Sequence, residues 1–368
     1  MTRSKTKNAA DATDWSMYKK KGYVGLANLG NTCFMNSCLQ VLNHTYELNR
    51  IFLVDKTHEH FVTSGSQIKD QEIDLVRNWV ELQTMLWSNN NCAISPGKFV
   101  FSVQNLAKIK DREIFTGWAQ NDMPEFLMFM IDSMHNVLAR HVRMNIQGTK
   151  KTNTDDLAIT CYEMLRTIYE KEYSEIHDLF YGIYVSILQP FDVASKGSKK
   201  PETFFILDLP IPTKKNTDPT TTLYDCFDLF TQKEVMEGDN AWHNDSTGQM
   251  EPATKQIQFW NLPKILVIVL KRFSNQGHLK RQDLVDFPFT GLDLSKYVCG
   301  YNPQSYVYDL YGVCNHMGGI MGGHYHCYVK NASDEWIHYN DANYTIMGSN
   351  TQVVSPAAYC LFYRKRNM

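Results

Sequence analysis

The chain has 368 residues, of which 43% are hydrophobic, and a formal net charge of −2 at pH 7. A chain of this size can bury a sizeable core, in one large domain or two small ones. The near-neutral charge argues against a broad basic face for nucleic acid, and no apolar run is long enough to cross a bilayer. We therefore expect no nucleic-acid partner and no membrane partner.

Residues 1–21 are polar and lysine-rich, without apolar periodicity, and differ from a secretion signal. We expect a flexible polar tail there, with packed structure beginning near Tyr23. The nine cysteines of the chain are odd in number and irregularly spaced, which is typical of a reducing compartment rather than of a disulfide framework. We therefore expect an intracellular protein, cytoplasmic or nuclear.

Helical spacing of apolar residues dominates to about residue 179, and short apolar runs between proline- and lysine-bearing loops dominate from about residue 180. The predicted helices include residues 73–87, 96–106, 124–141 and 156–173. The predicted strands include residues 182–188, 203–209, 265–270 and 306–314. The predicted fold class is therefore α+β, with a helical half and a sheet-rich half that meet at a cleft suited to catalysis.

One cysteine, Cys33, stands between the glycine-bearing loop 25–32 and residues 34–42, whose apolar positions have helical spacing. A helix start has unpaired N–H groups and partial positive charge, so we expect the pKa of the Cys33 thiol to fall and the thiol to be reactive. Cys38 lies roughly 140° further around this helix, and we expect it to be a small core side chain.

A second segment supplies a partner for this thiol. Residues 322–329 and 336–341 are typical of two short strands around a tight turn. A turn centred on residues 332–333 sets His324 opposite Asn340 or Asp341, depending on the length of the loop. An imidazole held by an amide or a carboxylate is a general base fixed in one tautomer. We prefer Asn340 as the partner and keep Asp341 as a helper.

These two segments, GLANLGNTCFMNS at residues 25–37 and GGHYHCYV at residues 322–329, resemble the cysteine and histidine boxes of the ubiquitin-specific proteases, the papain-like deubiquitinases. Three further blocks agree in the order of that family, at residues 120–127, 262–273 and 311–316. Five ordered blocks carry a far lower risk of a chance match than one short motif.

The resemblance implies a papain-like cysteine protease fold with a helical thumb, a β-sheet palm and β-strand fingers. It implies one catalytic domain over residues 22–368, with the thumb at about residues 22–179 and the fingers and palm at about residues 180–368. Ubiquitin and ubiquitinated proteins are the implied partners, and we expect the chain to act as a monomer.

The resemblance also implies how the site works. Cys33 would attack the carbonyl of the C-terminal glycine of ubiquitin, His324 would move the proton, and Asn340, aided by Asp341, would orient His324. Asn28 and the backbone N–H of Cys33 would stabilise the oxyanion. Water activated by His324 would then hydrolyse the acyl thioester.

Residues 120–125 match the family segment whose acids face the arginine-bearing tail of ubiquitin. Gln120, Asp122 and Glu125 are therefore candidate binding residues, because carboxylates pair with guanidinium groups. The same segment, taken by itself, predicts a capping box with Asp122 as N-cap, Pro124 in the first turn and Glu125 at the third position. Both interpretations can hold.

Two glycine pairs bracket residues 320–321 just before His324, and glycine lets backbone approach backbone closely. The resemblance implies a narrow channel here for the two terminal glycines of ubiquitin, with Gly322, Gly323 and Tyr325 as candidate substrate contacts. An ordinary flexible turn is the alternative interpretation of the glycines.

The chain contains no C-x-x-C pair, so we expect no metal ion and no cofactor. Many family members carry two such pairs in the fingers, where residues 186–190 and 242–245 stand here. Either aromatic packing holds these fingers together or they are looser than in the family. His326, on the strand face of His324, is either a catalytic accessory or a satisfied structural histidine, and we favour the structural interpretation.

Two other functions stay open. A catalytically silent ubiquitin-binding module could use the same scaffold, since a triad can be misaligned until substrate binds. A protease for a ubiquitin-like modifier would keep the chemistry and change the substrate, and the acids at residues 120–125 do not decide between the modifiers.

Overall fold

The computed structural model describes residues 14–62, 65–88, 92–192, 195–213, 220–273, 280–319 and 322–366. Residues 1–13 of the expected tail, and residues 320–321 between the glycine pairs, lie outside this description. The rest of the expected tail is mostly exposed but is anchored by Tyr18, which is 3% exposed and stacks on Tyr46 with ring centroids 4.7 Å apart. The expectation that packed structure begins near Tyr23 is therefore wrong.

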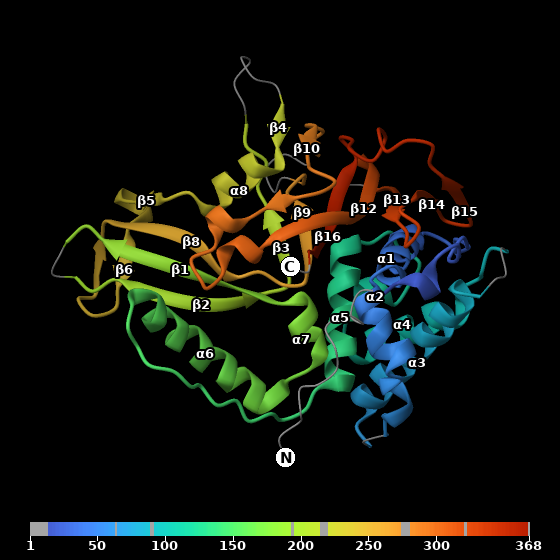
Figure 1. Ribbon diagram of the computed structural model, residues 1–368, viewed down its shortest axis with the longest axis horizontal. Helices are drawn as coiled ribbons and strands as arrows, with labels where there is room; N and C mark the ends of the chain where they lie inside the picture. The colour runs from blue at the N-terminus through green and yellow to red at the C-terminus, as the bar shows by residue number, and fades with distance from the viewer. Residues whose placement is uncertain are drawn as a thin grey trace.

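The first half of the chain is helical (Figure 1). Its helices are α1 (Cys33–Asn43), α2 (Tyr46–Asn49), α3 (Gln67–Leu86), α4 (Gly97–Ile109), α5 (Met123–Leu138), α6 (Asn153–Glu172) and α7 (Glu175–Phe180), with the short turns η2 (Ser16–Tyr18), η3 (Arg50–Val54), η4 (Thr57–His60) and η5 (Glu113–Phe115). Helices α1, α3, α4 and α5 pack together, and we call helices α1 to α5 the thumb. None of the described helices is long and apolar enough to span a membrane.

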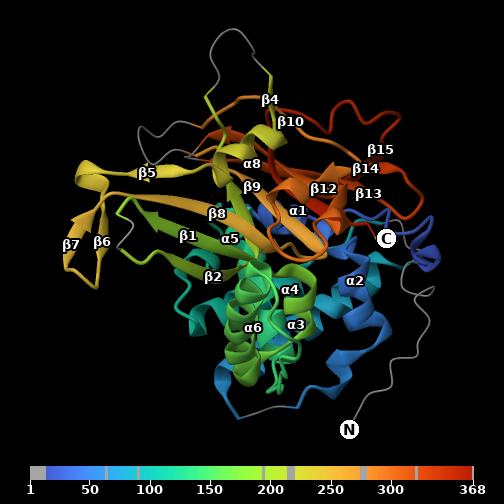
Figure 2. The same cartoon turned by 60° about the vertical axis from the view of Figure 1, so that its left-hand side comes forward.

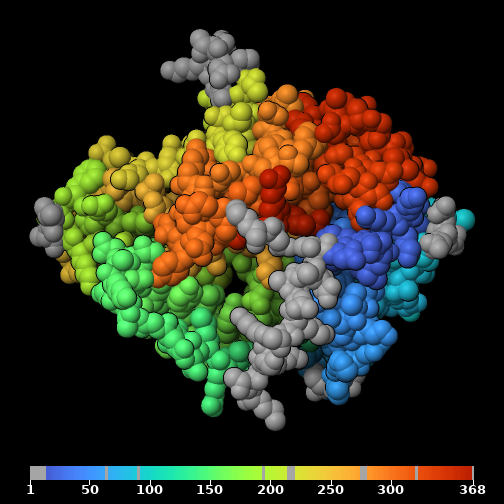
Figure 3. All heavy atoms as spheres, in the orientation of Figure 1, coloured from blue at the N-terminus to red at the C-terminus, as the bar shows by residue number. Residues whose placement is uncertain are grey.

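An eight-stranded sheet, here called the palm, fills the second half of the chain. Its strands are β3 (Ile206–Leu209), β9 (Ile265–Leu270), β11 (Leu292–Asp293), β12 (Val307–Gly319), β13 (Gly322–Lys330), β14 (Trp336–Asn340), β15 (Asn343–Ile346) and β16 (Ala358–Lys365). The strand order is β15-β14-β13-β12-β16-β9-β3, with β11 paired to β12. Figure 3 shows the blue thumb helices and the red end of the palm side by side on one face.

Each face of the palm covers a separate core, because successive side chains of a strand point to opposite faces. Tyr325 and Cys327 of β13 lie in the core shared with the thumb helices. Tyr328 of the same strand lies in the second core, with Val313 and Leu361. Helix α1 packs directly on β13, so the elements that carry the predicted nucleophile and the predicted base lie against each other.

A four-stranded sheet of order β2-β1-β8-β5, here called the fingers, projects from the palm (Figure 2). It consists of β1 (Gly182–Pro190), β2 (Ser198–Phe204), β5 (Glu234–Met236) and β8 (Ala253–Asn261), and the hairpin β6 (Trp242–Asn244) and β7 (Gln249–Glu251) lies at its tip. The remaining elements are α8 (Leu223–Thr231), β4 (Thr221–Thr222), β10 (Val285–Asp286), η6 (Gly238–Asn240), η7 (Ser295–Tyr297) and η8 (Pro303–Ser305).

The fingers are held by packing and by one hydrogen-bonded carboxylate. Helix α6 places Cys161 in a small core with Val185 and Trp260 of the fingers, although we expected this helix in the thumb. At the tip, the Glu251 carboxylate accepts hydrogen bonds from Ser195 Oγ (2.7 Å), Asn244 Nδ2 (2.9 Å) and Thr247 Oγ1 (2.7 Å). These contacts join the β1–β2 connection to the β6–β7 hairpin.

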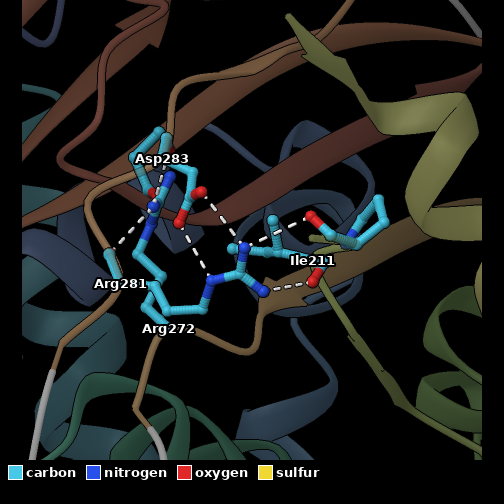
Figure 4. A network of polar contacts seen from close by, with 6 residues as sticks. Ile211, Arg272, Arg281 and Asp283 are labelled. Carbon is cyan, nitrogen blue, oxygen red and sulfur yellow. Dashed lines mark hydrogen bonds and ion pairs between the residues drawn. The ribbon is translucent and has the colours of Figure 1, made fainter. Parts of the chain in front are cut away.

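Two arginines, Arg272 and Arg281, form a network of polar contacts just after the end of β9 (Figure 4). Arg272 is 0% exposed, and its guanidinium donates to the carbonyls of Ala358 (2.6 Å) and Asp283 (2.9 Å). The Arg281 guanidinium lies between the Asp283 carboxylate, 2.9 Å from Nε, and the carbonyl of Ile211. Burial lowers the pKa of Arg272 to about 10, since the charge is removed from water.

Most predicted elements are present, but their ends differ. Helix α3 begins at Gln67 rather than residue 73, because its first turn is mostly polar and its one apolar residue, Ile68, is exposed. Helix α5 ends at Leu138 rather than residue 141, and β12 runs to Gly319 rather than residue 314.

Candidate active site

Cys33 is the first residue of α1 and is 3% exposed, so its thiol lies inside the fold. Burial raises the pKa of the thiol, and the charge of Asp341 raises it further. Hydrogen bonds from the backbone of Tyr325 and Phe34 act in the opposite direction but do not compensate. The expectation that the helix start lowers the pKa of Cys33 is therefore wrong in this state. The contact with Tyr325 places the sulfur beside the residue that follows His324.

The loop before Cys33 lies directly against the end of β14. The N–H of Leu26 donates to the carbonyl of Asp341 at 2.8 Å. A Cβ atom on Gly25 would lie 2.1 Å from the carbonyl oxygen of Ala342, so only glycine permits this approach. The close contact fixes the loop that carries the candidate nucleophile relative to the hairpin that carries the candidate base.

His324 donates from Nε2 to Asn340 Oδ1 at 2.7 Å. An oxygen acceptor requires the proton on Nε2, which leaves Nδ1 of the neutral ring as a proton acceptor. The hairpin register differs from the prediction, because Tyr328 lies opposite His338 and Cys327 opposite Tyr339. Extended toward the start of β13, this register sets His324 opposite residue 342, so the contact with Asn340 is diagonal.

Among the described residues, Asp341 makes no hydrogen bond to His324, and its carboxylate instead holds the loop before α1. Its carboxylate accepts from Asn28 Nδ2 at 3.0 Å and from Asn36 Nδ2 at 2.8 Å. Its own backbone is left-handed, with φ of 50°. Asn28 Oδ1 in turn accepts from the N–H of Thr32 at 3.1 Å. Since the Asn28 amide nitrogen carries two hydrogens, one remains for a developing oxyanion.

Gln120 links the loop before Cys33 to the start of β13. Its Oε1 accepts from the N–H of Gly323 at 2.8 Å, and its Nε2 donates to Asn31 Oδ1 at 3.4 Å. Gly323 directly precedes His324, and Asn31 lies two residues before Cys33. A Cβ atom on Gly322, where φ is 152°, would lie 2.8 Å from Gln120 Oε1. The structure therefore brings Gln120, Gly322 and Gly323 together beside the candidate catalytic residues.

The two acids of this block have different surroundings. Asp122 is the N-cap of α5 but makes no side-chain cap bond, so the predicted capping box is wrong. Its carboxylate instead accepts from the hydroxyls of Tyr325 (2.9 Å) and Tyr359 (3.1 Å). Burial raises the pKa of Asp122 and of Tyr325. Glu125 is exposed and lines a separate groove of about 190 Å³ with Lys110, Met128 and Asp132.

Three residues at this site were not predicted. Asn36 lies one helical turn after Cys33, and that spacing was the available signal. Asn31 meets Gln120 through the packing of distant segments, and Nε2 of His338 meets Nδ1 of His326 across the β13–β14 hairpin. Neither contact was predicted. Among the described residues, no group of three or more His, Cys, Asp or Glu side chains could hold a metal ion.

The α+β fold, a buried cysteine at a helix start and a histidine bonded to an asparagine define a papain-like cysteine hydrolase. The family model described as ubiquitin carboxyl-terminal hydrolase matches residues 24–363. The chain therefore belongs to the ubiquitin carboxyl-terminal hydrolase family.

Curated relatives agree with this assignment. The chain is 35% identical to human ubiquitin carboxyl-terminal hydrolase 2 over 93% of its own length and 55% of the relative. It is 33% identical to Usp2 of Drosophila melanogaster over 94% of its length and 35% of that relative. Hydrolase 4 of Saccharomyces cerevisiae is 31% identical over 93% of this chain and 39% of the relative. The chain thus spans about a third to just over half of these relatives.

Solved structures share the fold. The structure described as the SAGA Ubp8/Sgf11/Sus1/Sgf73 DUB module bound to ubiquitin aldehyde contains a chain with a TM-score of 0.71 and 24% identity, covering 96% of this chain and 71% of that one. A second structure of the Ubp8-Sgf11-Sgf73-Sus1 module gives a TM-score of 0.67 and 24% identity over 94% and 68%. The predicted papain-like α+β fold is confirmed.

Proposed function

We propose that this chain is a cysteine deubiquitinase, a thiol isopeptidase that cleaves after the C-terminal glycine of ubiquitin. Family membership supports the reaction class. The observation that carries the proposal is the convergence of the buried Cys33 thiol, the backbone of Tyr325 and the 2.7 Å hydrogen bond between His324 and Asn340. These groups supply a nucleophile, an adjacent base and a group that orients the base.

In the proposed reaction, His324 accepts the thiol proton at Nδ1 as Cys33 attacks the carbonyl carbon. The imidazolium then returns a proton to the departing lysine amine, which leaves an acyl thioester on Cys33. The free hydrogen of the Asn28 amide and the backbone N–H of Cys33 stabilise the oxyanion. Water deprotonated by His324 hydrolyses the thioester and restores the thiol. Asp341 acts on Asn28 and Asn36 rather than on the imidazole.

The residues around the cleft are proposed substrate contacts. Gln120 and the glycine pair Gly322 and Gly323 would meet the backbone of the ubiquitin tail, since Gly323 N–H is a donor beside His324. The exposed Glu125 is the carboxylate proposed to pair with an arginine of that tail. Tyr325 and Asp122 hold each other, so their proposed role is to shape the wall of the channel.

Ubiquitin and ubiquitinated proteins are the proposed partners. One structural neighbour is described as bound to ubiquitin aldehyde, which supports ubiquitin as the ligand. Neighbours of this fold belong to a module of four named components, so a monomer stays a prediction. No disulfide joins the described cysteines, which supports a reducing compartment, cytoplasmic or nuclear. One catalytic domain over residues 22–368 is also part of the proposal.

Hydrolysis of a fluorogenic ubiquitin derivative by the purified chain and by Cys33→Ala tests the proposal. Wild-type turnover that disappears in the variant supports a cysteine deubiquitinase. Undiminished turnover of Cys33→Ala would contradict the role of Cys33. Tight ubiquitin binding without turnover by the wild type would support the silent module, and turnover only of a ubiquitin-like derivative would support the related protease.

A further inference from the structure

A second polar pair lies beside the candidate catalytic pair on the same hairpin. Nδ1 of His326 and Nε2 of His338 are 2.9 Å apart and share a hydrogen bond. His326 follows His324 by two residues on β13, and His338 precedes Asn340 by two residues on β14. Because side chains alternate along a strand, all four side chains point to the same face of the palm.

The two pairs repeat one geometry. Tyr328 lies opposite His338, and continuation of this register sets His326 opposite Asn340. Each hydrogen bond therefore runs diagonally between the strands in the same sense, first from His324 to Asn340 and then from His326 to His338. In this continued register, Asn340 is the residue across the strands from His326, and it accepts the hydrogen bond from His324.

The second pair is well packed. His326 is 7% exposed, and on its other side β12 sets Asn315, which is 1% exposed, opposite it. Tyr328 stacks on His338 with ring centroids 4.7 Å apart and an interplanar angle of 30°. Tyr328 itself lies in the second palm core. The hydrogen-bonded imidazoles therefore connect that core to the solvent-facing end of the hairpin, where His324 lies half-buried.

The pair also carries no charge at neutral pH. Burial lowers the pKa of His326 to about 4, and the nearby His338 and His324 lower it further. Burial likewise lowers the pKa of His338. Two neutral imidazoles can share a hydrogen bond as one donor and one acceptor. A neutral pair does not repel the positive charge that His324 gains in the reaction. A second cation nearby would make protonation of His324 less favourable.

We propose that His326 and His338 are a positioning pair for the reaction, which holds Asn340 and thereby His324 in the geometry that takes the proton from Cys33. This inference rests on the proposed function and extends it. A satisfied structural histidine was the sequence-based interpretation of His326. The hydrogen bond to His338 does satisfy His326. Because His326 lies across the strands from Asn340, we infer that this hydrogen bond also affects catalysis.

Two variants of His338 separate the hydrogen bond from packing. His338→Phe keeps a ring against Tyr328 but cannot bond to His326, whereas His338→Gln places an amide nitrogen near the position of Nε2 and keeps the bond. His135→Gln is the matched control, because His135 also makes a buried hydrogen bond, 2.7 Å to Ser174 Oγ, but in the thumb. Thermal melting confirms that each variant is folded.

The readouts are kcat and KM on fluorogenic ubiquitin and the rate of Cys33 alkylation by iodoacetamide, followed by peptide mass mapping. We expect His338→Phe to lower kcat and the alkylation rate roughly tenfold or more, with KM within about twofold. His338→Gln should stay within about threefold of the wild type in both rates. His135→Gln should leave both rates unchanged.

Equal rates for folded His338→Phe and His338→Gln would overturn the inference. If His338→Phe does not fold, His326→Asn with His326→Phe gives the same comparison from the other strand, because an asparagine nitrogen takes the place of Nδ1. Absence of ubiquitin hydrolysis by the wild type would instead contradict the proposed function. The alkylation assay uses no ubiquitin, so it tests the positioning pair in that case too.

Discussion

Burial outweighs the backbone hydrogen bonds to the Cys33 sulfur and raises the pKa of this thiol, which favours its protonated form. Activation therefore depends on His324, and His324 depends on Asn340 for its tautomer. This order of dependence makes the amide of Asn340 a sensitive position, although it never touches the substrate in the proposed reaction.

Replacement of Asn340 by alanine removes the acceptor for His324 Nε2. We expect Asn340→Ala to lower kcat by roughly ten- to a thousandfold with little change in KM, because the imidazole loses both its tautomer and its orientation. Asn340→Asp keeps an oxygen acceptor and should retain more activity. The exposed neighbour Asn343→Ala is the control. Activity of Asn340→Ala within about twofold of wild type would contradict the role of the amide.

Asp341 couples two amides that stabilise the loop before α1. We expect Asp341→Ala to lower the free energy of unfolding by about 1–3 kcal/mol, since Asn28 and Asn36 both lose a charged acceptor. A double-mutant cycle with Asn36→Ala, measured by urea unfolding, should give a coupling energy of about 1 kcal/mol or more. Strict additivity of the two substitutions would show that the hydrogen bond contributes nothing.

At the scale of the element, the β13–β14 hairpin shows what local pattern can and cannot predict. The predicted His324–Asn340 contact is present, but as a diagonal pair rather than a directly opposed one. Both strands follow from residue spacing. The register does not, because the connection is longer than a tight turn. Asn331 Oδ1 accepts from the N–H of Glu335 at 3.0 Å, and Asp334 adopts a left-handed conformation with φ of 63°. Such side-chain turn closure is set by details that alternation of apolar residues does not carry.

Helix α5 also shows that a local sequence pattern does not predict every contact. The pattern of Asp122, Pro124 and Glu125 predicts the start of the helix, and the helix does begin there. The capping bond is absent because two tyrosine hydroxyls from the palm, on Tyr325 and Tyr359, compete for the carboxylate. Tertiary contacts between distant segments override a local preference here.

Gln120 joins the segment before α5 to β13, and this link makes a testable contribution to substrate binding. We expect Gln120→Ala to raise KM about three- to tenfold while kcat stays within about threefold, because it removes an interaction made equally in the ground and transition states. The half-buried Gln104→Ala, which removes a side-chain hydrogen bond to the carbonyl of Gly117, is the matched control. A large fall in kcat with unchanged KM would contradict a binding role for Gln120.

At the scale of the whole molecule, several buried histidines make stability depend on pH. Burial lowers the pKa of His44, His177, His316 and His326 to about 4, below the usual value of 6.5. The unfolded chain therefore binds more protons than the folded one between about pH 6.5 and 4. The free energy of unfolding should fall as the pH falls through this window. Above the window, these histidines should not make the free energy of unfolding change with pH.

Urea unfolding at pH 7, 6 and 5 measures this dependence. His177→Gln removes one of the four groups and should reduce the slope of unfolding free energy against pH by up to about one proton. A free energy of unfolding that is constant between pH 7 and pH 5 would contradict the account of the buried histidines.

The packing of the thumb on the palm explains why the sequence predicts the candidate catalytic residues better than it predicts the contacts around them. Cys33 and His324 lie in blocks with strong local patterns, so each could be identified before the fold was known. The contacts that join the blocks, such as those of Gln120 with Asn31 and Gly323, depend on how the thumb packs on the palm. No periodicity within either half encodes that packing.

The central claim is that Cys33 is the nucleophile that His324 activates toward the C-terminus of ubiquitin. Peptide mass mapping after reaction with a ubiquitin whose C-terminus carries an electrophile tests it most directly. We predict one adduct, on Cys33, which is absent from Cys33→Ala and strongly reduced in His324→Ala. An adduct on the exposed Cys92 in place of Cys33, or ubiquitin binding with no adduct at all, would contradict the account.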